Sequence, residues 1–287
     1  MLENLEGKVA VVTGAASGIG RALASKFADE GMMLVLADIE ASSLGEVARE
    51  FEARGIDVLS LRTDVTQADD LSALAEATIE RFGAVHVLCN NAGVFVGGLS
   101  WEASQTDWDW VLGVNVFGII HGIRAFVPIM LEQNEPSHIV NTVSMAGLIN
   151  TPFSGPYNMS KHAAMSLTET LFHEMQARES PIGVSALCPE LVRTGIAQSE
   201  RNRPEHLKRP DGPLSPVLEM LEGAIREGVS SGVEPSMMAE RVVEGIRTDR
   251  FYLMADEGTS WDIECLKRLE DIRLRRNPNS GLNVASN

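Results

Sequence analysis

Residues 9–20 read VAVVTGAASGIG, and this stretch decides the fold. Residues 9–13 form a short apolar run, as in a buried strand. The glycines at 14, 18 and 20 permit a tight turn, and the amphipathic stretch 20–30 has the length of a helix. Three residues separate the first two glycines, which differs from the common G-x-G-x-x-G pattern. A strand, a glycine-rich turn and a helix in succession nevertheless favour a site where amides at the helix start stabilise a pyrophosphate.

Six further apolar runs have a similar length, at residues 32–38, 58–61, 85–90, 139–143, 184–188 and 251–254. Amphipathic stretches of helical length separate most of them, for example 42–54 and 68–82. Strands that are continuously apolar, without alternation, indicate a parallel sheet covered by helices on both faces. We therefore predict an α/β fold with a doubly wound, Rossmann-like parallel sheet of about seven strands. Such a sheet binds ligands at the carboxyl ends of its strands.

Composition limits the class of protein. The 287 residues contain no Pro/Gly/Ser-rich linker, so we expect a single domain over 1–287. A formal charge of -16 argues against binding to nucleic acid or to an anionic membrane. No apolar run approaches the length of a membrane span, and the amino terminus lacks the pattern of an export signal. The cysteines and histidines show no disulfide or metal-ligand spacing. We expect a cytoplasmic protein without a metal site.

A second stretch, residues 143–161, reads VSMAGLINTPFSGPYNMSK and combines a hydroxyl, a phenol and an ammonium. Tyr157 and Lys161 are four positions apart in a helical run over 157–178, so they share one face of that helix. The turn-rich segment 150–156 allows Ser144 to meet Tyr157. We expect the ammonium to lower the pKa of the phenol, so that Tyr157 acts as a general acid or base while Ser144 holds a substrate oxygen. For the Tyr-Lys pair alone, an ordinary amphipathic helix is the alternative.

Asp38 ends the second predicted strand, where a carboxylate accepts hydrogen bonds from the hydroxyls of an adenosine ribose. The alternative is an Asp that begins a turn or caps the next helix. In the first case its charge repels a 2′-phosphate, and neither Ser17 nor Ile39 supplies a basic side chain that would attract one. The sequence therefore favours NAD over NADP.

From about residue 7 to residue 254 the chain resembles the classical short-chain dehydrogenase/reductase (SDR) family. The resemblance rests on several motifs in order: the glycine turn at 13–20, Asp64-Val65, Asn90-Asn91-Ala92-Gly93, and the tetrad Asn115, Ser144, Tyr157 and Lys161. It implies that the tetrad is catalytic, that Lys161 also binds the nicotinamide ribose, and that Asn115 holds a water for proton relay. For Asn115 the alternative is a helix-interior Asn that bonds its own backbone. Asn90 is interpreted as structural.

The resemblance also implies a set of cofactor contacts. They are Gly14, Ser17, Gly18, Ile19, Gly20, Asp38, Asp64, Val65, Asn91, Ala92, Gly93, Tyr157, Lys161, Pro189, Val192 and Thr194. One departure from the family lies at residues 188–194, CPELVRT, because the family commonly has Pro-Gly where this chain has Pro189 and Glu190. The Glu190 side chain either contacts substrate or, as we expect, points into solvent.

The segment 190–235 is expected to form a mobile substrate lid, with a helix over 217–227. Phe95, Met145 and Phe153, with Val96 and Glu190, are predicted to line a mainly apolar substrate pocket. The carboxy-terminal extension, 255–287, contains a helix-like stretch at 261–276 that either packs on a neighbouring subunit or frays.

These features favour an NAD-dependent oxidoreductase that interconverts a bulky, largely apolar secondary alcohol and its ketone. The partner is a small-molecule substrate, and the family resemblance implies a homotetramer or homodimer. The alternatives are a catalytically silent dinucleotide-binding regulator of the same fold, an enzyme that uses NADP, and another redox-cofactor reaction such as epimerisation. The intact tetrad favours an enzyme, because a pure binder needs no Tyr-Lys pair.

Overall fold

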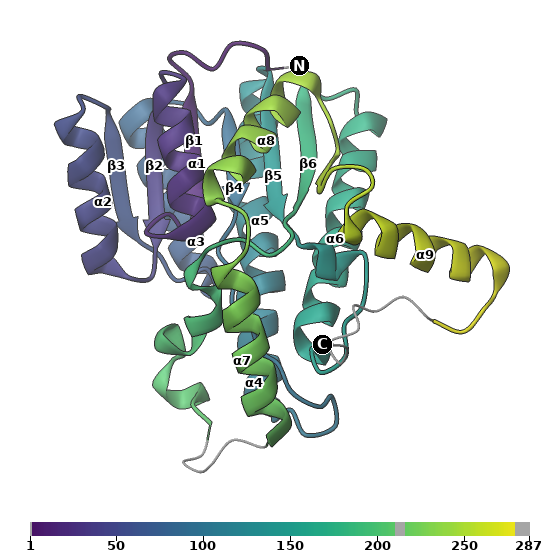
Figure 1. The fold of residues 1–287 in the computed structure, drawn as a ribbon. Coiled ribbons are helices and arrows are strands. Elements are labelled where there is room, and N and C mark those ends of the chain that lie inside the picture. The colour runs from purple at the N-terminus through teal and green to yellow at the C-terminus, as the bar shows by residue number, and fades with distance from the viewer. Residues whose placement is uncertain (1, 210–215, 279–287) are drawn as a thin grey trace.

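A computed structural model describes residues 2–209 and 216–278. Within them, seven parallel strands form one sheet in the order β3-β2-β1-β4-β5-β6-β7 (Figure 1). The strands are β1 (Val9–Thr13), β2 (Met33–Asp38), β3 (Val58–Arg62), β4 (Val87–Asn90), β5 (Ser137–Thr142), β6 (Ile182–Cys188) and β7 (Tyr252–Met254). The winding reverses between β1 and β4, as in a doubly wound sheet. The predicted fold class and strand number are confirmed.

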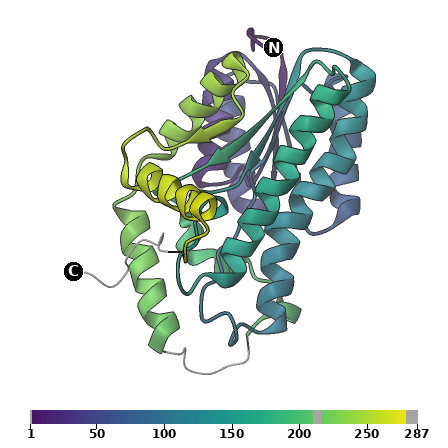
Figure 2. The same ribbon diagram turned by 90° about the vertical axis from the view of Figure 1, so that its right-hand side faces the viewer.

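Helices cover both faces of the sheet (Figures 1 and 2). One face carries α1 (Gly18–Asp29), α2 (Ala41–Ala53) and α8 (Pro235–Thr248). The other carries α3 (Ala68–Phe82), α5 (Gly118–Gln133) and α6 (Gly155–Ala177). The helix α4 (Gln105–Leu112) precedes α5 and packs with α6 and with the loop after β4. Outside these layers, α7 (Pro216–Ser230) lies beyond the carboxyl ends of the strands, and α9 (Ser260–Leu274) projects from the body. The short helices are η1 (Gly113–Phe117), η2 (Met145–Gly147), η3 (Gly195–Asn202) and η4 (Glu205–Leu207).

The core explains why the strands are continuously apolar. Ala10 and Val12 of β1 pack with α1, α2 and α8, whereas Val9 and Val11 pack with α3, α5 and α6. Successive side chains of a strand point to opposite faces, so a strand between two helical layers needs apolar residues at every position. The sheet is therefore fixed from both sides, and its loops at the carboxyl ends remain available for a site.

The predicted element ends shift by one or two residues at several places. The run 85–90, for example, becomes the shorter strand β4, which begins at Val87. The Val85 amide donates to the side chain of Gln133 at 3.0 Å and so stands outside the strand ladder, and the His86 ring accepts from the Val9 amide at 3.1 Å. Apolar periodicity does not report such contacts.

The continuous helix Gln105–Gln133, which comprises α4, η1 and α5, is long and apolar enough to cross a membrane by length and composition. The expectation that nothing in the chain approaches such a length is therefore wrong. Phe126 and Met130 of α5 are fully buried against the sheet, as in a core helix. Packing in the core therefore explains why this helix is apolar.

The described part of the carboxy-terminal extension contains α9, close to the predicted helix at 261–276. Arg268 donates to the Leu148 carbonyl at 2.9 Å and holds α9 to the body. Residues 279–287 and part of the predicted lid, 210–215, lie outside the described residues. Contact of α9 with a neighbouring subunit remains a prediction.

Candidate active site

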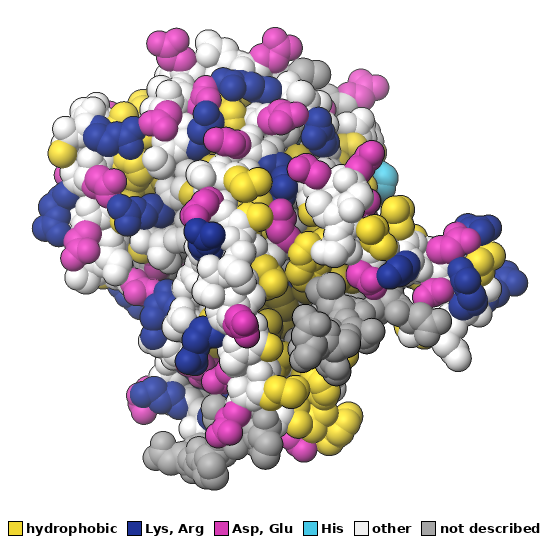
Figure 3. Space-filling view, in the orientation of Figure 1, with side chains coloured by type: hydrophobic (Ala, Val, Ile, Leu, Met, Phe, Trp, Pro, Cys, Tyr) yellow, Lys and Arg dark blue, Asp and Glu magenta, His cyan; other side chains and the backbone are white. Residues whose placement is uncertain are grey.

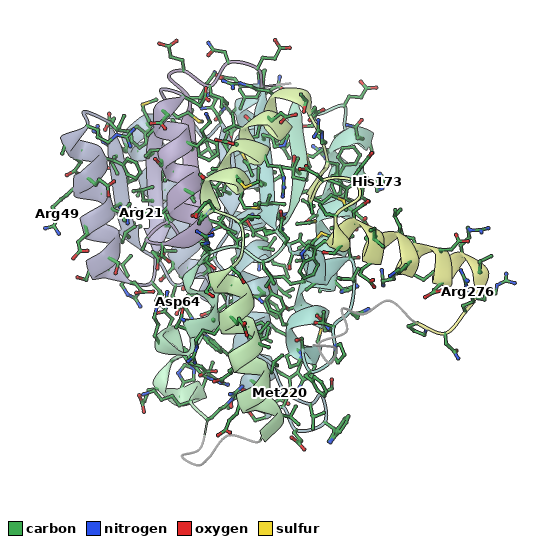
Figure 4. The ribbon with its side chains drawn as sticks, viewed as in Figure 1. Arg21, Arg49, Asp64, His173, Met220 and Arg276 are labelled. Carbon is green, nitrogen blue, oxygen red and sulfur yellow. The ribbon has the colours of Figure 1, made fainter. Side chains whose placement is uncertain are left out.

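A cavity of about 430 Å³ lies at the carboxyl ends of the strands. Asp64, labelled in Figure 4, belongs to this edge of the sheet. The predicted site residues that line the cavity are Gly14, Ser17, Gly18, Ile19, Asp38, Asp64, Val65, Asn91, Ala92, Gly93, Phe95, Ser144, Tyr157, Lys161, Pro189, Glu190, Val192 and Thr194. Residues at the carboxyl ends of the six strands β1 to β6 thus meet two residues of α6 around one space.

Some predicted site residues lie elsewhere. Met145 is buried among Val143, Ile149 and other core residues, and Phe153 lies in the turn before α6, where its carbonyl accepts from the Gly98 amide at 2.7 Å. Neither lines the cavity, and nor does the buried Val96. Their prediction as pocket residues is wrong, because Met145 and Val96 pack in the core and the half-buried Phe153 lies outside the cavity lining.

The glycine turn is closely packed. Gly14 has a φ of +69°, and a Cβ there would lie 3.0 Å from the Ala92 Cα. Gly20 does not line the cavity; a Cβ at this position would lie 2.0 Å from the Gly14 carbonyl oxygen. The two glycines therefore let the turn, the start of α1 and the loop after β4 approach one another, which leaves backbone exposed to the cavity.

Asp38 holds this turn in place. One carboxylate oxygen accepts from the Ala16 amide at 2.9 Å, and the other accepts from the Glu40 amide at 3.0 Å. Asp38 thus begins a turn, as one interpretation of the sequence states, and it also lines the cavity, while its contact with a ribose stays a prediction. A carboxylate has about four acceptor positions, so capacity remains for a ligand hydroxyl.

Asn91 ties together the ends of three strands. Its side-chain amide donates to the Thr13 carbonyl at 2.9 Å, and its side-chain oxygen accepts from the Thr142 hydroxyl at 3.2 Å. Asn90 points away from the cavity and donates to Asn141 in the core at 2.9 Å. Asn90 is therefore structural, whereas Asn91 shapes the floor of the cavity.

Asn115 is fully buried in the π-helix η1 and does not line the cavity. Its side-chain oxygen accepts from the Val94 amide at 2.9 Å, while its side-chain amide donates to the Val94 carbonyl and the Ser160 hydroxyl, both at 3.0 Å. The alternative in which it bonds its own helix is wrong. Its side chain clamps the loop after β4 to α6, and the relay water stays a prediction.

Ser144, Tyr157 and Lys161 face the cavity from two elements. The Lys161 ammonium lies 5.7 Å from the centroid of the Tyr157 ring and donates to the Thr142 carbonyl at 3.0 Å. The Ser144 hydroxyl donates to the Pro189 carbonyl at 3.4 Å and accepts from the Ala146 amide at 3.1 Å. Turn 150–156 thus brings the serine to the tyrosine, as the spacing predicts.

Burial dominates the electrostatics of this group. Burial raises the pKa of Tyr157, and a hydrogen bond with the Ser144 side chain lowers it by a smaller amount. Burial also lowers the pKa of Lys161 to about 8. The expectation that Lys161 brings the phenol pKa below its usual value is wrong for the protein alone, because desolvation of the phenolate is larger than the effect of its neighbours.

Glu190 neither points into solvent nor stands free for a substrate. Its carboxylate accepts from the two terminal nitrogens of Arg241 in α8, at 3.0 and 3.3 Å, and both side chains are mostly buried. The expectation of a solvated carboxylate is wrong, because a partner 51 positions along the chain lies beside it.

The cavity wall includes residues that sequence reasoning did not assign to the site. Leu221, Ala224, Ile225 and Val229 of α7 line it, together with Trp261 at the start of α9. Hydrophobic side chains gather beside α7 (Figure 3), while Met220, labelled in Figure 4, lies on its exposed side. The helical spacing of Leu221 and Ile225 signalled an apolar face, but no pattern in the sequence places Trp261 here.

Within residues 2–209 and 216–278, no group of three His, Cys, Asp or Glu side chains could hold a metal ion. In one part of the cavity Ser144, Tyr157 and Lys161 bring together a hydroxyl, a phenol and an ammonium. The arrangement suits the transfer of a proton at an oxygen held by Ser144.

Comparison with known proteins gives consistent matches. The model of the short chain dehydrogenase family matches residues 8–205. A short chain dehydrogenase/reductase from Burkholderia phymatum, solved in complex with NAD, is 46% identical with a TM-score of 0.94, over 98% of this chain and 99% of that one. The 1-deoxy-11-beta-hydroxypentalenate dehydrogenase of Streptomyces exfoliatus is 34% identical, over 88% of this chain and 84% of its own. An alcohol dehydrogenase from the archaeon Thermococcus sibiricus, complexed with 5-hydroxy-NADP, is 25% identical with a TM-score of 0.71, over 87% of this chain and 96% of that one.

Proposed function

The chain belongs to the short-chain dehydrogenase/reductase family, and we propose that it uses NAD to interconvert a bulky, largely apolar secondary alcohol and its ketone. Membership makes it an oxidoreductase with dehydrogenases among its relatives. One observation carries the proposal: a single cavity joins the glycine turn and Asp38 to Ser144, Tyr157 and the apolar wall of α7.

The residues present fit a dinucleotide. The close approach of backbone at Gly14 and Gly20 leaves the turn without side chains between its backbone and the cavity at Gly14 and Gly18, and the start of α1 favours a pyrophosphate beside it. Asp38 would receive the adenosine ribose, and its charge favours NAD over NADP. The Burkholderia neighbour solved with NAD supports this choice. A bound NAD would supply the hydride acceptor, and the positive charge of its oxidised ring would favour the phenolate of Tyr157.

The chain's own residues handle the proton. In alcohol oxidation the Ser144 hydroxyl holds the substrate oxygen, and the Tyr157 phenolate accepts the hydroxyl proton as the carbonyl forms. In ketone reduction Tyr157 returns that proton. The Lys161 ammonium, fixed by the Thr142 carbonyl, supplies positive charge beside the phenol and would bind the nicotinamide ribose.

The substrate class follows from the wall of the cavity. Aliphatic side chains from α7 and the indole of Trp261 offer apolar contact area and few polar partners, which suits a bulky apolar alcohol. A relative that dehydrogenates a hydroxypentalenate derivative supports this class.

The test is nicotinamide reduction, followed by absorbance, on a panel of secondary alcohols of increasing bulk with NAD and NADP in parallel. The proposal expects turnover with NAD that increases with apolar bulk. Binding of NAD without turnover of any alcohol or ketone would contradict it and favour the regulator.

A further inference from the structure

Glu40 joins the turn after β2 to a distant part of the chain. One oxygen of its carboxylate accepts from Nε and Nη2 of Arg201, at 3.0 and 2.8 Å, and from the Asn202 side chain at 2.8 Å. Arg201 and Asn202 end η3, inside the segment 190–235, and all three residues line the cavity. The contact therefore fastens η3 to the rim on which Asp38 lies.

Both partners are held in place by other bonds. The Glu40 amide donates to the Asp38 carboxylate at 3.0 Å, which ties the two acidic residues into one turn. Nη1 of Arg201 donates to the carbonyls of Gly195 and Gln198, each at 3.0 Å, so the guanidinium is fixed within η3. Because Nη1 is occupied within η3, Arg201 directs Nε and Nη2 toward the rim, and Glu40 accepts from both.

The charge of Arg201 has a particular location. Of the described residues that line the cavity, the two with cationic side chains are Lys161 and Arg201, and Lys161 lies beside Tyr157. Arg201 is thus the cation near Asp38, where an unpaired guanidinium would attract a 2′-phosphate. The hydrogen bond from Asn202 and the charge of Arg201 hold the pKa of Glu40 below its usual value, so Glu40 is a carboxylate at neutral pH.

We propose that Glu40 is a determinant of cofactor choice, because it occupies Arg201 and leaves a net negative charge beside the adenosine ribose. This inference rests on the dinucleotide site proposed above. Asp38, Glu40 and Arg201 together carry one negative charge, which disfavours a phosphate. Without the charge of Glu40 the sum is zero, and a neutral side chain competes less strongly than a carboxylate with a phosphate for the N–H donors of Arg201.

The test is binding, measured by the fluorescence of NADH and NADPH without substrate. Glu40→Gln keeps a side-chain acceptor for Asn202 but removes the charge. We expect it to tighten the binding of NADPH by roughly tenfold, because one repulsive charge is lost beside the phosphate. The affinity for NADH should fall several-fold, because η3 is held less firmly over the cofactor.

Two further variants test whether the change in NADPH affinity depends on Arg201 and on the location of the lost charge. In Glu40→Gln/Arg201→Met the gain for NADPH should disappear, since the cation that binds the phosphate is gone. Glu30→Gln is the matched control, because it removes one negative charge from an ion pair with Arg247, and neither residue lines the cavity. The ratio of the Kd for NADPH to the Kd for NADH should not change in this variant.

An unchanged ratio in Glu40→Gln, or a gain that persists without Arg201, would overturn the inference while leaving the dinucleotide site intact. Failure of the wild-type chain to bind either dinucleotide would overturn the proposed function and this inference together.

Discussion

The carboxylate of Glu190 and the guanidinium of Arg241 form a two-pronged ion pair that joins the loop after β6 to α8. The residue before Glu190 is Pro189, whose carbonyl accepts from the Met145 amide at 3.0 Å and from the Ser144 hydroxyl at 3.4 Å. The pair therefore anchors the loop whose Pro189 carbonyl contacts Ser144.

The first prediction concerns this pair. Arg241→Met leaves a mostly buried carboxylate without its partner and should lower the free energy of unfolding by about 3 kcal/mol, as measured by urea denaturation. Glu190→Gln/Arg241→Met should recover most of that loss, because no unpaired charge remains. The control is Arg193→Met, which breaks the exposed pair with Glu234 and should change the free energy by less than about 1 kcal/mol. Equal losses in the two single variants would contradict this account.

Proton transfer is tested by Tyr157→Phe. This variant should bind NADH as the wild type does, while kcat falls by roughly two to four orders of magnitude, because the phenol oxygen that exchanges the proton is gone. The chain has 2 tyrosines, and Tyr252→Phe is the matched control, since the Tyr252 hydroxyl bonds Glu169 on the surface. Near-normal turnover in Tyr157→Phe would show that Tyr157 is not the general acid/base.

The depressed pKa of Lys161 predicts a dependence of stability on pH. The folded chain holds this pKa at about 8, below its ordinary value of 10.5, so between these values the unfolded chain binds more protons and stability rises with pH. At pH 7 the buried charge costs at most about 3 kcal/mol. Lys161→Met, without dinucleotide, should therefore melt at a higher temperature than the wild type at pH 7.

The gap between these two melting temperatures should narrow from pH 8 to pH 10, as Lys161 loses its proton in the folded wild type. The lost hydrogen bond to the Thr142 carbonyl reduces the gap at every pH without changing this trend. A gap that stays constant or widens over that range would show that Lys161 is not the titrating group.

Substrate size is tested at Trp261. Trp261→Ala removes apolar area from the cavity wall and should raise KM roughly tenfold for the bulkiest alcohol that the enzyme turns over, with little change for a small one such as 2-propanol. Trp101→Ala is the control, because Trp101 is 80% exposed and does not line the cavity. An equal rise in KM for all alcohols in Trp261→Ala would show that the indole supports the packing of the protein and does not select substrates by size.

Local patterns in the sequence were sufficient for the sheet and for most of the site. The continuous apolar run 9–13 is explained by burial on both faces, and the glycines at 14 and 20 by the close approach of backbone. The spacing of Tyr157 and Lys161 places both at one cavity, since a helix fixes the direction of side chains four residues apart. Each of these inferences depends on neighbours along the chain.

The tertiary structure decided what depends on neighbours in space. The partners of Glu190 and Glu40 lie 51 and 161 positions away, and no periodicity connects them. The direction of the Tyr157 pKa shift was also beyond the sequence, because desolvation depends on everything packed around the phenol. Local sequence determined the strands, the glycine turn and the spacing of Tyr157 and Lys161, since backbone geometry is local. Packing decided which charges are paired, which residues form the cavity wall and how readily Tyr157 ionises, because burial and Coulomb energy depend on distance in the folded molecule.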